Sequence, residues 1–105
     1  MTEFVKKRAT QMRQIGAEYG RDLAAALLLA VEQDPADLAV ERRMTAIVLR
    51  EIGAAVQRLR DASLPELFVA IYERACRESC RAELLAAIAE RQADTGGTRA
   101  ARAAA

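Results

Sequence analysis

Two cysteines are the side chains whose spacing most directly suggests chemistry. Cys76 and Cys80 are four residues apart, so on a helix their thiols lie on one face and could bind one metal ion together. A structural zinc site needs four ligands, and because the chain has no histidine, only a second chain's cysteine pair would complete it. A disulfide between adjacent helical turns has poor geometry. We therefore expect reduced, buried thiols and no metal or cofactor, and a redox role stays open.

The lack of histidine also bears on catalysis. It removes the usual general base near neutral pH and the partner of a serine or cysteine nucleophile. The carboxylates alternate with arginines along the expected helix faces, as solvated charges do, and the glycines form no phosphate-binding loop. We expect no catalytic residue, no enzyme activity and no small-molecule substrate.

The charge balance argues against nucleic acid and membranes as partners. The chain has 16 basic and 15 acidic residues, so its net charge is only +1. A helix-turn-helix would require a turn near Ala55, but the apolar periodicity continues through Leu59. The apolar run from Leu23 to Val31 is much shorter than the roughly 18 residues that cross a bilayer, and the chain starts with charged residues. We expect a cytoplasmic protein.

The composition predicts an all-α fold. Apolar residues make up 52% of the chain and aromatic residues only 4%, alanine is abundant, and there are 5 glycines and 2 prolines. Asp34-Pro35 indicates a helix start, and Ser63 with Glu66 has the pattern of a capping box at another. These signals predict helices over about 2–33, 35–60 and 64–92.

Short connections then predict three long antiparallel helices, as a hairpin or a bundle completed by dimerisation. We expect one helical domain over 1–93. Gly96 and Gly97 can end the last helix, and no large apolar residue follows them, so 94–105 is expected to be a flexible tail. Whether Gly16 and Gly20 break the first helix stays open.

The first helix carries more apolar surface than one seam needs. The run from Leu23 to Val31 coats every side of the helix, because successive residues advance by about 100°. Its expected core seam consists of Val5, Ala9, Met12, Gly16, Tyr19, Leu23, Leu27 and Val31. Leu28 and Leu29 lie outside that seam, so they belong either to intramolecular core or to an interface with a second copy or a partner.

The other two helices show a similar excess. In the second, Leu38 and Leu49 widen the apolar arc beyond the stripe of a one-sided helix. The third has an expected core seam of Leu64, Leu67, Phe68, Ile71, Tyr72, Ala75, Ala82, Leu85 and Ala89. A second stripe consists of Val69, Cys76, Cys80 and Leu84, and it is either additional core or a contact surface.

In length, number of helices and composition, the chain resembles the quorum-sensing anti-activators of Pseudomonas, small helical proteins that bind LuxR-type receptors. The resemblance is one of layout over the whole chain, and no motif carries a functional residue across. It implies a homodimer that sequesters a transcription factor. The interface residues that we expect are Leu28, Leu29, Leu38, Leu49, Val69, Cys76, Cys80 and Leu84. The alternatives are a structural subunit of a phage or secretion assembly and, third, a DNA-binding regulator.

Overall fold

The chain folds into three helices. The computed structural model describes the backbone of residues 2–33 and 38–104, and the side chains of 2–30, 43–90 and 93. The helices are α1 (Glu3–Gln33), α2 (Leu38–Asp61) and α3 (Glu66–Ala104), and the described residues contain no strand. The all-α prediction is confirmed. The predicted start at Asp34-Pro35 lies outside the described residues.

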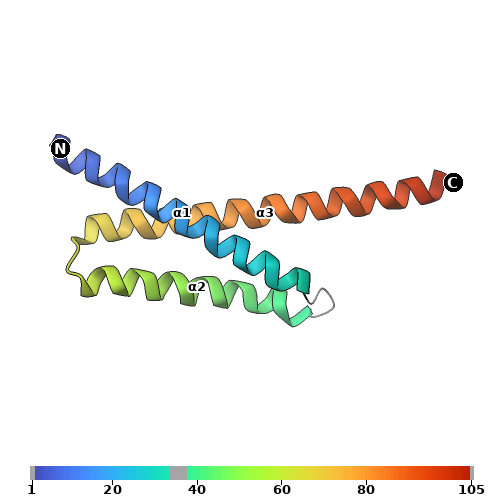
Figure 1. Ribbon diagram of the computed structural model, residues 1–105, viewed down its shortest axis with the longest axis horizontal. Coiled ribbons are helices and arrows are strands. Elements are labelled where there is room, and N and C mark those ends of the chain that lie inside the picture. The colour runs from blue at the N-terminus through green and yellow to red at the C-terminus, as the bar shows by residue number, and fades with distance from the viewer. Residues whose placement is uncertain (1, 34–37, 105) are drawn as a thin grey trace.

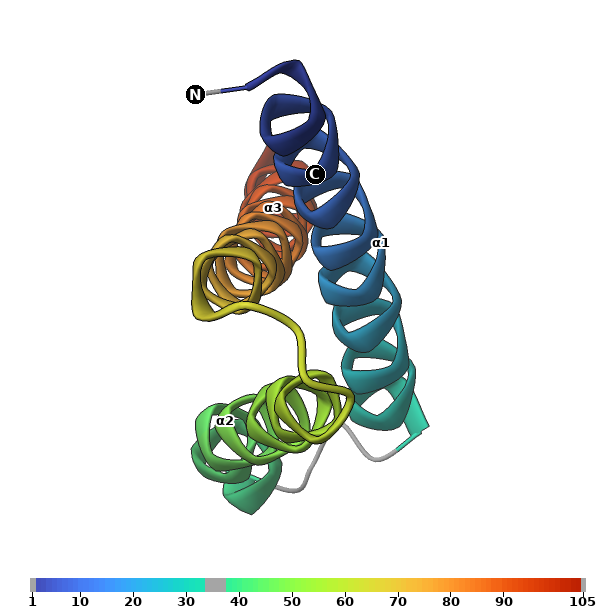
Figure 2. The same cartoon turned by 90° about the vertical axis from the view of Figure 1, so that its left-hand side faces the viewer.

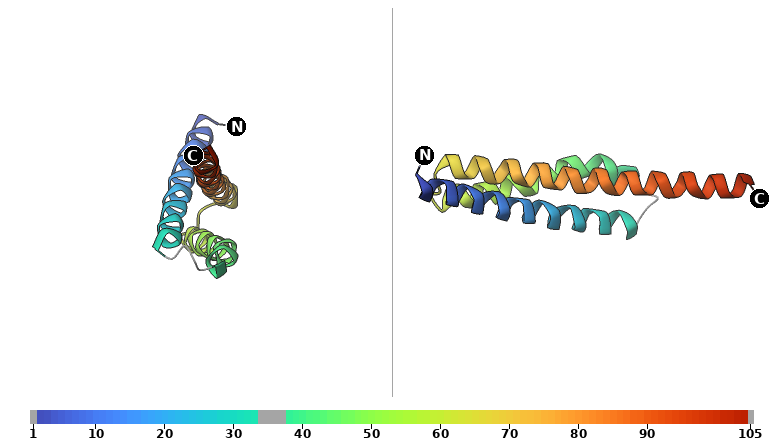
Figure 3. Two further views of the ribbon diagram at one scale, coloured as in Figure 1. Left: turned by 90° about the vertical axis from the view of Figure 1, so that its right-hand side faces the viewer. Right: turned by 90° about the horizontal axis from the view of Figure 1, so that it is seen from above.

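The helices run up, down and up, so that consecutive helices are antiparallel as predicted (Figure 1). The middle of α1 crosses the N-terminal third of α3 obliquely, and α2 lies alongside with fewer close approaches to either helix. The C-terminal part of α3 extends beyond both other helices (Figure 3).

The resulting shape is elongated and thin. The principal extents of the Cα trace are 64 × 28 × 15 Å, and its radius of gyration is 17.9 Å. A compact domain of this length has a radius of gyration of about 13 Å. The three helices therefore leave much of their surface uncovered by one another.

Two glycines allow α1 to approach α3 closely. A Cβ atom added at Gly16 would lie 2.6 Å from the Tyr72 carbonyl oxygen, and one at Gly20 would come closer still to the Cys76 carbonyl oxygen. The glycines do not break α1, which is continuous. They are needed because the α3 backbone occupies the space where a side chain would stand.

The core lies where the three helices meet. Its large buried side chains include Met12 of α1, Ile52 and Val56 of α2, and Phe68, Val69, Tyr72 and Cys76 of α3. Hydrogen bonds between described residues join α1 to each of the other two helices. The Tyr19 hydroxyl donates to the Glu51 carbonyl oxygen of α2 at 3.3 Å, and the Ser79 hydroxyl donates to the Ala17 carbonyl oxygen of α1 at 2.8 Å.

The two apolar stripes of α3 have their expected roles only in part. Val69, Cys76 and Cys80 are at most 1% exposed, so this part of the second stripe is buried in the chain's own core, one of the two roles expected for it. Leu67 and Leu85, predicted as core, are about half exposed. The reason is the position of α1, because Gly16 and Gly20 draw it onto the side of α3 that carries the cysteines.

The connection between α2 and α3 differs from the predicted capping box. Ser63 has a φ of 62° and ends α2, with its N–H donating to the Arg60 carbonyl oxygen and the Leu64 N–H to that of Leu59. This is a Schellman motif with serine at the left-handed position. The Glu66 carboxylate accepts from Arg60 at 3.0 Å, and this hydrogen bond raises the pKa of the Arg60 guanidinium.

The predicted end of the last helix near residue 92 is also wrong, because α3 continues to Ala104. Gly96 and Gly97 lie inside the helix, and no glycine of the described backbone has a positive φ. Alanine, the strongest helix former, stands further along on both sides, at positions 93, 100, 101 and 103.

Candidate functional site: an apolar groove between α2 and α3

A hollow with mostly apolar walls lies between α2 and α3, and we call it the α2–α3 groove. Its α2 wall consists of Met44, Thr45, Val48 and Leu49. Its α3 wall consists of Arg77, Cys80, Arg81, Leu84 and Leu85. The cavity volume is about 330 Å³. No described residue of α1 lines it, since α1 packs across another side of α3 (Figure 2).

The groove brings together three of the predicted interface residues. Leu49 is 52% exposed at one wall, Leu84 is half-buried at the other, and Cys80 lies beneath them with its side chain almost inaccessible. Their helices, α2 and α3, are antiparallel neighbours, and the lining residues of each wall come from adjacent turns of its helix. Leu85 adds a 54% exposed side chain to the α3 wall.

The other predicted interface residues lie elsewhere. Leu29 is 57% exposed and Leu28 half-buried towards the end of α1, and neither lines the groove. Val69 and Cys76 belong to the core. The Leu38 side chain lies outside the described residues.

Charge at the groove has one sign. Its charged lining residues are Arg77 and Arg81, and no described carboxylate lines it. Arg77 forms an ion pair with Glu73 at 2.7 Å, whereas no other described side chain forms an ion pair with Arg81. The α3 edge of an apolar surface is thus positively charged.

The buried thiols of Cys80, which lines the groove, and of Cys76, which belongs to the core, are held in their neutral form. Burial raises the pKa of Cys76 to about 11, against a smaller opposing effect of its hydrogen bond with Tyr72, and burial also raises the pKa of Cys80. A thiolate is the form that attacks disulfides and binds metals. No group of three or more cysteine, aspartate, glutamate or histidine side chains that could hold a metal occurs within the described residues.

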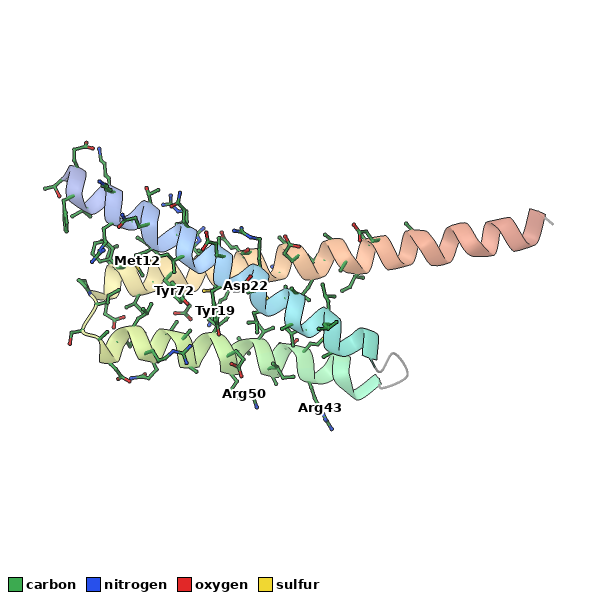
Figure 4. The ribbon with its side chains drawn as sticks, viewed as in Figure 1. Met12, Tyr19, Asp22, Arg43, Arg50 and Tyr72 are labelled. Atoms are coloured by element: carbon green, nitrogen blue, oxygen red, sulfur yellow. The ribbon has the colours of Figure 1, made fainter. Side chains whose placement is uncertain are left out.

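Other surfaces are less suited to bind an apolar ligand. A hollow between α1 and α3 has charged walls, where Arg74 forms an ion pair with Glu78 at 2.9 Å. On the outer side of α2, Arg43 and Arg50 point away from the other helices (Figure 4), and Arg50 lies 3.5 Å from the Glu51 carboxylate. Among the exposed apolar residues outside the groove, Phe4 lines a hollow whose other lining residues are charged or polar, namely Glu3, Lys6, Lys7 and Thr10.

Sequence reasoning missed Leu85 as a surface residue and assigned it to the core. Helical periodicity identifies this residue as apolar but does not say how far α2 lies from α3. The spacing of Gly16, Gly20 and Ala24 was the available signal, because small residues four apart allow a close helix crossing that draws one neighbour in.

No helix of the described residues is long and apolar enough to span a membrane. Comparison with protein-family models, with curated proteins and with solved structures finds no match to this chain.

Proposed function

We propose that this chain is a cytoplasmic protein-binding regulator that acts by covering part of another protein's surface. The observation that carries the proposal is the α2–α3 groove, whose walls expose Leu49 and Leu85 on a body that three helices leave open. Contiguous exposed apolar surface on a small protein is characteristic of a binding site.

The layout resemblance to quorum-sensing anti-activators favours a transcription factor of the LuxR type as the partner. Such a regulator needs no chemistry of its own. It needs only an apolar surface that competes with the partner's own dimerisation or DNA contacts. The neutral thiols of Cys76 and Cys80 and the mixed charges along α2 agree with a binding role.

A homodimer is part of this proposal. The exposed Leu29 and the half-buried Leu28 leave an apolar surface towards the end of α1 that is separate from the groove. Burying one leucine stabilises an interface by roughly 1.5–3 kcal/mol. A second copy that covers this surface would leave the groove available to the partner.

One observation favours the alternative of a structural subunit in a larger assembly. Phe4, Ile15 and Leu67 are exposed at separate places on α1 and α3, and separate apolar contacts suit a chain that touches several neighbours. Light scattering of the purified chain distinguishes the two, since the proposed regulator gives a dimer and an assembly subunit gives a ring or polymer.

The direct test is recovery of the partner. The tagged full chain is incubated with extract of its native cell, and the bound proteins are identified by mass. We expect a transcription factor whose binding to its promoter DNA, measured by gel shift with purified components, falls as the chain is added. Recovery of no regulatory protein, or unchanged DNA binding at saturating chain, would contradict the proposal.

A further inference from the structure

We infer that the α2–α3 groove binds one amphipathic helix of a partner protein, with apolar side chains in the groove and carboxylates beside Arg77 and Arg81. This inference rests on the proposed protein-binding function and adds the site and the chemistry of the partner. Its two supports are the shape of the groove and its charge.

The shape favours a helix. The walls are two antiparallel helices, α2 and α3, with apolar residues on neighbouring turns of each. A helix laid between two others presents residues i, i+3, i+4 and i+7 to them, which is a recurring mode of peptide recognition. α1 already packs on another side of α3, so a helix in the groove would be the fourth of a bundle (Figure 2).

The charge favours a partner with carboxylates. Arg77 and Arg81 are one helical turn apart and both line the groove. Arg77 shares its charge with Glu73, but Arg81 has no ion-pair partner among the described side chains. Glutamates on the edge of the incoming helix would pair with this edge, and lysines there would be repelled.

The test uses the full chain and two synthetic helical peptides of about five turns. Both carry leucines at i, i+3, i+4 and i+7. One has glutamates and the other lysines at the positions that flank the leucines. Binding is measured by fluorescence anisotropy at low and high salt, and the site is mapped by NMR shifts of the chain's backbone amides.

We expect the glutamate peptide to bind at least about tenfold more tightly than the lysine peptide, with the difference shrinking at high salt. The largest amide shifts should come from Thr45, Val48, Leu84 and Leu85. Equal binding of the two peptides, tighter binding of the lysine peptide, or shifts centred on α1 would overturn the inference.

Matched variants locate the contact. Leu85→Glu should weaken the glutamate peptide by about tenfold or more. Leu67→Glu should leave it unchanged, because Leu67 lies on the same helix with nearly the same exposure, 53% against 54%, but outside the groove. Arg81→Glu should reverse the preference between the peptides, whereas Arg21→Glu on the exposed surface of α1 should not. Equal effects within either pair would overturn the inference.

Two further outcomes identify a different occupant. If the chain alone forms a dimer that Leu85→Glu dissociates and Leu67→Glu does not, the groove is a contact between copies. If a small apolar molecule copurifies with the wild-type chain and is absent from Leu85→Glu, the groove is a ligand site. Either result would overturn the inference.

Failure of the proposed regulatory function can be distinguished from failure of the groove assignment. If wild type and Leu85→Glu recover the same partner from extract equally well, the chain binds proteins and the groove assignment is wrong. If wild type recovers no partner but the peptides behave as expected, the groove assignment stands and the regulatory function fails.

Discussion

At the scale of single residues, the glycines of α1 matter more than its leucines. Gly16 and Gly20 fix where α1 crosses α3, and that crossing decides that Val69, Cys76 and Cys80 are core while Leu85 is surface. Glycine has no hydrophobic signal, so a search for apolar periodicity passes over the residues that set the packing.

Gly20→Ala should destabilise the fold. The added Cβ would overlap the Cys76 carbonyl oxygen and lie 3.1 Å from the Ser79 Cβ, so the helices must separate. The expected cost is about 1–3 kcal/mol in urea unfolding, even though alanine is the better helix former.

Gly53→Ala is the matched control, since a Cβ there meets nothing within 4 Å. It should stabilise the chain by about 0.5–1 kcal/mol. If both substitutions stabilised the chain, the close crossing of α1 and α3 would be wrong.

The buried thiols predict a stability that falls at alkaline pH. The folded pKa of Cys76 is raised to about 11, while an unfolded thiol has a pKa of about 8.5. The stabilisation is fully present below the unfolded pKa and is lost as the pH rises through the folded one. Urea unfolding should therefore give the same free energy at pH 7 and pH 8, and a declining one from about pH 9 to 11.

The control is the double substitution Cys76→Ala with Cys80→Ala. It should lower stability at neutral pH but remove the decline near pH 9, leaving only a later decline from Tyr72, whose pKa is also raised by burial. A wild-type chain that keeps its full stability up to pH 11 would contradict the burial of the thiols.

At the scale of elements, the three-helix architecture was predictable from the sequence, but the end of the last helix was not. The helix-forming composition and the breaks near residues 34 and 62 predict three helices, and three are observed. The end of α3 could not be placed, because Gly96 and Gly97 stop a helix only when tertiary contacts or a left-handed residue favour stopping.

The same limit applies to the candidate site. Leu49 and Leu84 were predicted as interface residues and line the groove, whereas Leu85 was assigned to the core. Which apolar residue is covered depends on the spacing of α2 and α3, and a single helix's sequence does not encode that spacing. For Leu28, Leu29 and Leu38 the interface assignment stays a prediction.

The connection between α2 and α3 offers a test that separates two structures. With Ser63 in the left-handed conformation, Ser63→Gly should stabilise the chain by up to about 1 kcal/mol, because glycine adopts a positive φ without strain. In a capping box, loss of the hydroxyl in Ser63→Ala costs about 0.5–2 kcal/mol.

Here Ser63→Ala should change stability by less than about 0.5 kcal/mol, because no helix N-terminus depends on that hydroxyl. Thermal unfolding of Ser63→Ala, Ser63→Gly and wild type distinguishes the Schellman motif from a capping box. A large loss in Ser63→Ala together with no gain in Ser63→Gly would restore the capping box.

At the scale of the whole molecule, the chain has more apolar surface than three helices bury. Its radius of gyration of 17.9 Å and its exposed residues in the α2–α3 groove describe a body with an open side. An uncovered apolar groove with arginines at one edge is expected to bind a helix of complementary charge. The chain then supplies three helices of a four-helix bundle, and the partner supplies the fourth.

The most direct test is the double variant Leu49→Glu with Leu85→Glu, one substitution in each wall of the groove. Two quantities are measured on the same preparation: the free energy of unfolding in urea, and the amount of partner recovered at a fixed concentration of chain. We expect a stability within about 1 kcal/mol of wild type, since both side chains are about half exposed, together with loss of partner binding. A chain that unfolds would show that these leucines are core, and a folded chain that recovers as much partner as wild type would show that the groove is not the binding site.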